Sequence, residues 1–208
     1  MYKQVMAATV GLLMLGAVTV AQAADSKVIH PVRGTIDKIE NNYLDMTTSR
    51  THQSLHVKLT DDTGVLAVTN ADFAAIKPDS YIGSAAIPQS DGTLKALEVH
   101  VFDPSLRGAG EGHYGWENAD GSTGTMTNGS VGSFVKSDGR TLVVDYNGEQ
   151  KKLTVPDNVP IVAVAPGDRS LLKAGAKIVL FPDKDKSHGD DLVAARISVG
   201  KNGVAPPM

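Results

Sequence analysis

Two stretches of the chain match each other along their length, LHVKLTDDTGVLAVTNADFAAIKPDSYIGSAAI at residues 55–87 and KKLTVPDNVPIVAVAPGDRSLLKAGAKIVLF at residues 151–181. Val68 in the first stretch corresponds to Val164 in the second. Self-similarity at a fixed offset is the signature of a duplicated structural unit. The sequence therefore predicts two copies of one small fold.

Each copy can be followed beyond the quoted core, from residue 32 to 102 and from 129 to 199. Within a copy, apolar residues recur at every second position, as in Leu55, Val57 and Leu59. This is the period of a half-buried β-strand. The final strand of each copy repeats the pattern, and we expect its inward face to hold these residues: Leu97, Val99, Val101, Ala195, Ile197 and Val199.

Turn signals separate the apolar runs. Hairpin chemistry occurs at four dipeptides: Asn41-Asn42, Asp91-Gly92, Asp138-Gly139 and Asn147-Gly148. One short helical turn is expected per copy, at Asp72–Ile76 and Asp168–Leu172, each capped by its aspartate and each inserting its last residue under the sheet.

The predicted fold class is therefore all-β, with two tandem small five-stranded OB-like barrels, each carrying one short helical turn. An SH3-like barrel would give nearly the same pattern. The expected organisation is a signal peptide, a first barrel, a glycine-rich linker, a second barrel and a C-terminal tail, at 1–23, 24–102, 103–128, 129–200 and 201–208.

The first 23 residues have the order of a secretory signal peptide, with Lys3 before an apolar run from Val5 to Val20 and the small-residue end Ala21-Gln22-Ala23. We expect cleavage near Ala23, a periplasmic or secreted product, and no membrane span in the mature chain. The chain has no cysteine, so its stability cannot depend on disulfides.

The duplicated unit and the segment between the copies resemble one bacterial family. The turns IKPDSYIG (76–83) and LLKAGAKI (171–178), with RGAGEGHYGW (107–116) and TMTNGSV (125–131), resemble the two-copy form of the exported domain of unknown function 5666, DUF5666. The resemblance covers essentially all of the mature chain. It implies no particular activity, because that family has no settled one.

Charge and composition argue against nucleic acid as a partner. The formal net charge is −3, no basic run is visible, and aromatic residues make up 5% of the chain. Affinity for nucleic acid rests largely on neutralised phosphates and stacked aromatic rings. An unknown small molecule or a protein is the expected partner.

The segment between the copies holds the candidate binding residues, which are Arg107, Glu111, His113, Tyr114 and Trp116. We expect first a structural join in which the two aromatic side chains anchor glycine-rich backbone, and second a binding loop on a rigid scaffold. Trp116 should then be substantially buried. Glu111 and His113 are the candidate metal ligands, but two ligands make a weak site, so Asp103 or Asp120 would have to contribute.

Several short motifs suggest chemistry that their surroundings do not support. Asp62-Thr63-Gly64 resembles an aspartic-protease triplet, yet the second copy has no matching acid, so it is interpreted as a turn. Ser170 and Lys173 have a serine–lysine spacing without its companion motifs. Residues 183–191 have alternating acids, but a calcium loop would need glycine in place of His188 and a bidentate glutamate in place of Ala194. The remaining five histidines are all expected on the surface: His30, His52, His56, His100 and His188.

These observations favour a non-enzymatic periplasmic binding or interaction module without an intrinsic cofactor. A periplasmic metal-handling protein that uses Glu111 and His113 is the first alternative, and an unrecognised hydrolase is the second. No catalytic residue is predicted.

Overall fold

Strands make up nearly all of the regular structure, as predicted. The computed structural model describes residues 28–135, 140–187 and 192–208, so the expected signal peptide, the Asp138-Gly139 turn and His188 lie outside the described residues. The strands are β1 Val32–Glu40, β2 Tyr43–Thr48, β3 Ser54–Lys58, β4 Gly64–Ala71, β5 Tyr81–Pro88, β6 Leu94–Ala96, β7 Val99–Phe102, β8 Gly112–Glu117, β9 Thr123–Phe134, β10 Thr141–Tyr146, β11 Glu149–Thr154, β12 Ile161–Pro166, β13 Lys177–Pro182 and β14 Leu192–Gly200. Single 3₁₀ turns occur at η1 Phe73–Ala75, η2 Pro104–Leu106 and η3 Arg169–Leu171.

Five strands close on themselves as a barrel, in the order β1-β2-β3-β14-β13 and back to β1. All neighbours in this ring are antiparallel except β3 and β14, which run parallel. A second ring of paired strands follows the same pattern, β9-β10-β11-β6-β5 and back to β9, with β11 and β6 parallel. Closing a sheet in this way removes the free edges on which other chains could add.

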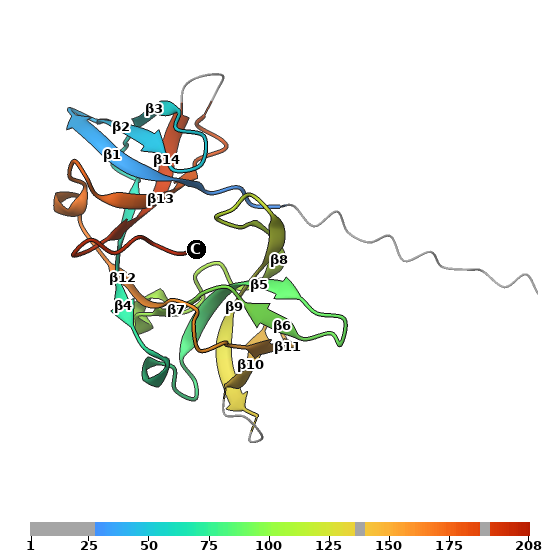
Figure 1. Ribbon diagram of the computed structural model, residues 1–208. Helices are drawn as coiled ribbons and strands as arrows, with labels where there is room; N and C mark the ends of the chain where they lie inside the picture. Colours follow the sequence, from blue (N-terminus) through green and yellow to red (C-terminus); the bar gives the residue numbers. More distant parts are fainter. Residues whose placement is uncertain (1–27, 136–139, 188–191) are drawn as a thin grey trace, which may run out of the picture.

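The two rings exchange strands between the copies, which corrects the expected boundaries of 24–102 and 129–200. β1 to β3 of the first copy are closed by β13 and β14 of the second, and the second copy's β9 to β11 are closed by β5 and β6 of the first. Figure 1 makes this visible: blue and red strands lie together at one end, green and yellow strands at the other. A tandem pair of barrels, each built from consecutive residues, is therefore not what the pairings give.

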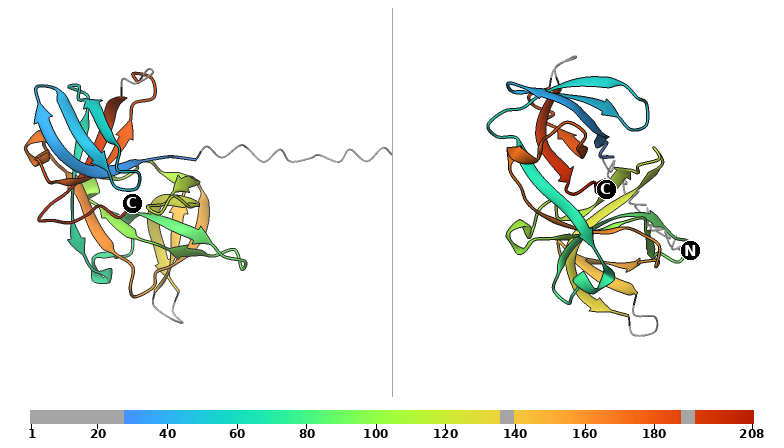
Figure 2. Two further views of the ribbon diagram at one scale, coloured as in Figure 1. Left: turned by 45° about the horizontal axis from the view of Figure 1, so that its top comes forward. Right: turned by 60° about the vertical axis from the view of Figure 1, so that its left-hand side comes forward.

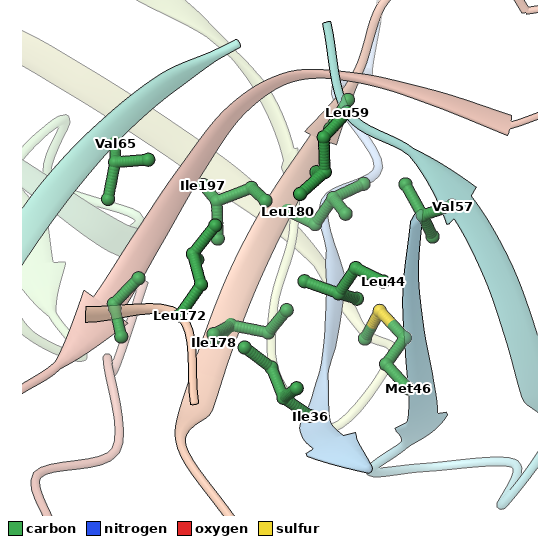
Figure 3. Close-up of a cluster of buried hydrophobic side chains, with 12 residues drawn as sticks. Ile36, Leu44, Met46, Val57, Leu59, Val65, Leu172, Ile178, Leu180 and Ile197 are labelled. Carbon is green, nitrogen blue, oxygen red and sulfur yellow. The ribbon is translucent and has the colours of Figure 1, made fainter. Parts of the chain in front are cut away.

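The hydrophobic cores confirm the exchange. One cluster unites Ile36, Leu44 and Val57 from the start of the chain with Ile178 and Ile197 from its end (Figure 3). Another unites first-copy residues such as Ile82 and Val99 with Leu142 and Leu153 of the second copy. A shared core makes the two halves stabilise each other.

β4 and β12 lie antiparallel at the centre of the molecule and relate the rings by a pseudo-two-fold axis. Val68 faces Val164, its own counterpart in the other copy. The ladder is symmetric about this pair. Asn70 lies opposite Val162, and their counterparts in the other copy, Pro166 and Leu66, also lie opposite each other. The two copies therefore meet symmetrically in this central ladder.

The local predictions mostly hold. Asn147 and Gly148 both have positive φ, 46° and 80°, as the predicted tight hairpin requires. Asp168 accepts a hydrogen bond from the Ser170 backbone N–H and caps η3. Asp72 was expected to cap η1 in the same way, but its side chain makes no capping bond.

Candidate functional site

The segment at residues 107–116 is tied to the β-structure by several polar contacts. The Arg107 guanidinium donates to Ser130 Oγ at 2.8 Å and to the carbonyl of Asp79 at 2.5 Å. The Tyr81 hydroxyl donates to the carbonyl of Ala109, and burial raises the pKa of Tyr81 to about 12. The phenol therefore remains a neutral donor at physiological pH, as an anchor for the loop requires.

Glu111 and His113 also have structural partners. Glu111 Oε1 accepts from the Asn147 backbone N–H at 2.9 Å, which fixes the loop to the β10–β11 turn. His113 Nδ1 lies 2.8 Å from Thr127 Oγ1 on the neighbouring strand β9. Within residues 28–135, 140–187 and 192–208, no group of three or more His, Asp or Glu side chains could hold a metal ion.

Burial makes the charged form of His113 unfavourable. It lowers the pKa of His113 below its ordinary value of 6.5, with a smaller contribution from the positive charge of Lys151. As the pH falls below 6.5, the unfolded chain binds this proton before the folded chain does, so the free energy of unfolding decreases. We expect His113→Asn to reduce this acid-side decrease, measured by urea unfolding from pH 7.5 to 5.

The matched control for this pH dependence is His52→Asn. His52 is exposed, and its positive φ of 53° is a backbone conformation that asparagine tolerates. The control should keep the slope of the unmodified chain. An unchanged slope in His113→Asn would contradict the assignment.

Trp116 is buried, as the sequence predicts, with 3% of its surface exposed. It lies on β8, which pairs with β9 from Gly112–Asn128 to Glu117–Thr123. Its ring centroid is 6.1 Å from that of Phe181 on β13, which comes from the far end of the sequence. The linker is therefore a packed strand at the junction of the two rings.

A pocket of about 430 Å³ opens at this junction. Its lining residues come from β4 and β12, from β7, from β8 and β9, and from β13 and β14. The C-terminal segment ends between the two groups of strands (Figures 1 and 2), and Met208 lines the pocket. Most of the lining is apolar, as in Leu66, Phe102, Trp116, Met126, Phe181 and Met208.

Unsatisfied polar atoms distinguish this pocket from a packing defect. Among the described residues, four buried side-chain atoms lack a hydrogen-bond partner, and three belong to pocket-lining residues: Trp116 Nε1, Asn128 Oδ1 and Arg196 Nε. Leaving a buried polar group unpaired costs about 1–3 kcal/mol. Unpaired polar atoms are therefore concentrated in the side chains that line this pocket.

Arg196 is the arginine in the pocket wall, and Glu111 is the carboxylate. Its guanidinium carbon lies 4.4 Å from the centroid of the Phe181 ring. Burial lowers the pKa of Arg196. The Tyr114 hydroxyl accepts from Asn128 Nδ2 at 3.0 Å, so these polar groups are neighbours.

His100 is buried, not on the surface as predicted. It is 4% exposed, and its Nδ1 lies 3.0 Å from the carboxylate of Glu98, which is 1% exposed. The face of β7 that was expected to lie in solvent is instead interior, where β7 lies between β12 and β5. Glycine at position 83 makes room, because a Cβ there would lie 2.1 Å from both His100 Nε2 and Asn128 Oδ1.

The five predicted site residues fall into two groups. Tyr114, Trp116 and Glu111 line the pocket, whereas Arg107 and His113 hold the loop against the rings. The sequence reasoning missed Arg196, Asn128 and His100. Arg196 and His100 both lie on the final strand of a copy, where apolar and polar residues alternate. The alternation placed them in solvent, and only the pairing of these strands with β12 and β4 shows that they are interior.

The rejected catalytic motifs have local structural roles. Asp62 lies in the turn before β4, and Thr63 Oγ1 donates to the carbonyl of Ala194. Ser170 lies within η3, and the following Leu172 is buried in the first core. Asp183 accepts from the backbone N–H of Asp185, so this stretch forms a turn.

Comparison of the chain with protein-family models, with curated proteins and with solved structures gave no match. In the described part of the chain, no helix has the length and hydropathy needed to cross a membrane. The site is therefore interpreted from its own geometry.

Proposed function

We propose that this protein is an exported, non-enzymatic binding module that holds a small molecule in the pocket between its two rings. The observation that carries the proposal is a pocket of about 430 Å³ with a largely apolar lining into which a few polar side chains, among them Tyr114, Asn128 and Arg196, are set. Small-molecule sites commonly have a volume of ~300–1,000 Å³, apolar walls and a few convergent polar groups.

The proposal also covers the type of barrel that each ring forms. When the strands are numbered within their copies and the central strands β4 and β12 are left out, each ring has the order 1-2-3-5-4 of an OB-like barrel, with the last two strands supplied by the other copy. We propose a pair of strand-exchanged OB-like barrels of the DUF5666 type. The signal-peptide pattern of the first 23 residues supports a periplasmic or secreted location.

Metal handling by Glu111 and His113 is less well supported. Both side chains already have protein partners, Asn147 and Thr127, and would have to leave them to coordinate an ion. The hydrolase alternative has no specific observation in its favour. Binding in the pocket is the function that the geometry supports best.

A fluorescent dye can test the pocket directly, because the single tryptophan of the chain lines it. N-phenyl-1-naphthylamine is neutral, apolar and accepts excitation energy from tryptophan. We expect saturable quenching of Trp116 emission with one dye molecule per chain. Leu66→Phe should weaken binding at least tenfold, because the larger ring fills pocket volume.

The matched control is Ile87→Phe. Ile87 is 43% exposed on β5 and does not line the pocket, so the same change of side-chain type should leave dye binding intact. Melting temperatures of both variants verify that each is folded. Absence of saturable quenching in the unmodified chain, or equal binding by Leu66→Phe, would overturn the proposed function.

A further inference from the structure

We propose that the ligand of this pocket is a monocarboxylate with an apolar body, whose carboxylate pairs with Arg196. This inference rests on the proposed function and names the chemical class that the site takes. It follows from the unpaired guanidinium of Arg196 in the pocket wall and from the largely apolar character of the lining, in which the one carboxylate, Glu111, is already bound to the backbone of Asn147.

The charge argument begins with Arg196. None of the ion pairs in the described chain includes its guanidinium, although every other partly buried arginine there, such as Arg33 and Arg140, has a carboxylate or main-chain oxygen as partner. A charge taken out of water is strongly unfavourable unless it is paired. An anion in the pocket would supply the missing partner.

The identity of the unpaired atoms narrows the anion further. Two of the three, Trp116 Nε1 and Arg196 Nε, are N–H donors, and both side chains flank the ring of Phe181. A carboxylate has two acceptor oxygens, and the fork of guanidinium N–H donors on Arg196 suits both of them. Asn128 Oδ1 is the one acceptor among the three atoms and lies beside Gly83 and His100 Nε2.

The rest of the surface selects the body of the ligand. Phe102, Met126 and Phe181 have no strong donor or acceptor in their side chains. Leu66 and Val164 add aliphatic surface to the lining. A highly charged ligand such as a sugar phosphate would lose hydration against these walls without compensation. An alkyl or aromatic skeleton gains free energy from the same burial.

The experiment compares three ligands of one chain length, decanoate, 1-decanol and decylamine, by displacement of N-phenyl-1-naphthylamine from the intact protein at pH 7.5. We expect decanoate to displace the dye at concentrations at least tenfold lower than decanol, with decylamine weakest. High salt should reduce this preference only modestly, because a partly buried ion pair is weakly screened.

Substitution then assigns the preference to one residue. Arg196→Met retains packing over Phe181 and should abolish the preference for decanoate over decanol while leaving dye affinity within about twofold. Arg196→Lys should retain part of it. The matched control, Lys201→Met, removes one exposed positive charge just beyond β14 and should leave the preference intact.

The two proposals fail in distinguishable ways. Equal displacement by decanoate and decanol in the unmodified chain, or a preference that survives in Arg196→Met, would overturn the carboxylate inference while leaving the pocket as a binding site. Absence of dye binding in the unmodified chain would overturn the proposed function, and the inference with it. The three-ligand comparison needs no variant, so it decides the matter even if Arg196→Met does not fold.

Discussion

Residues 28–102, produced without the rest of the chain, are expected not to fold as a monomer. This fragment contains the whole first copy of the repeat, yet one neighbour each of β1, β3 and β5 lies outside it: β1 pairs with β13, β3 with β14, and β5 with β9 along most of its length. The core around Ile36 would lose Ile178, Leu180 and Ile197. Circular dichroism and light scattering should find an unfolded chain or an exchanged dimer.

The control for the fragment experiment is complementation. Mixing residues 28–102 with residues 103–208 in equal amounts should restore a 1:1 complex with the circular dichroism spectrum of the intact chain, because the exchanged pairings can then form between fragments. A monomeric 28–102 with a cooperative unfolding transition would contradict the exchange.

A second large loss of stability is expected when a core residue on the final strand of either copy is truncated. Ile197→Ala and its counterpart Val99→Ala should each lower the free energy of unfolding by ~2–4 kcal/mol, the usual cost of a buried cavity. Both residues have no exposed surface. Urea unfolding followed by circular dichroism measures the change.

The comparison variant for this effect is His56→Ala. His56 is exposed, and its contacts with Asp45 and the Tyr43 ring are on the surface. Surface substitutions usually change stability by less than ~0.5 kcal/mol. A loss at His56 equal to that at Val99 would mean that the faces of these strands are assigned wrongly.

The strands, their turns and the inward residues Val99 and Ile197 could be predicted because they depend on local periodicity and turn chemistry. The exchange of strands could not. Two copies with one pattern can pair within a copy or between copies in the same register. In the structure Gly34 faces Ile178 of the other copy, and Ile82 faces Gly129 of the other copy. Because Ile82 and Ile178 are counterparts, Ile82 would suit the place opposite Gly34 equally well. Local pattern carries no information about which copy supplies the partner.

Only part of the site could be predicted, because the rest depends on the exchange of strands. Tyr114 and Trp116 stood out because large apolar side chains are rare in a glycine-rich segment, and they do line the pocket. Arg196 and His100 stood on strands whose alternation indicated solvent on their side. That face became interior once β4 and β12 brought the rings together.

The exchanged topology also fixes when this protein can fold. A chain that emerges N-terminus first, from a ribosome or through a translocation channel, presents β1 to β3 long before β13 and β14, which close their ring by pairing with β1 and β3. The first ring closes only after β14 has emerged. Pairings so distant in sequence slow folding, which keeps the chain open during any passage that requires an unfolded polypeptide.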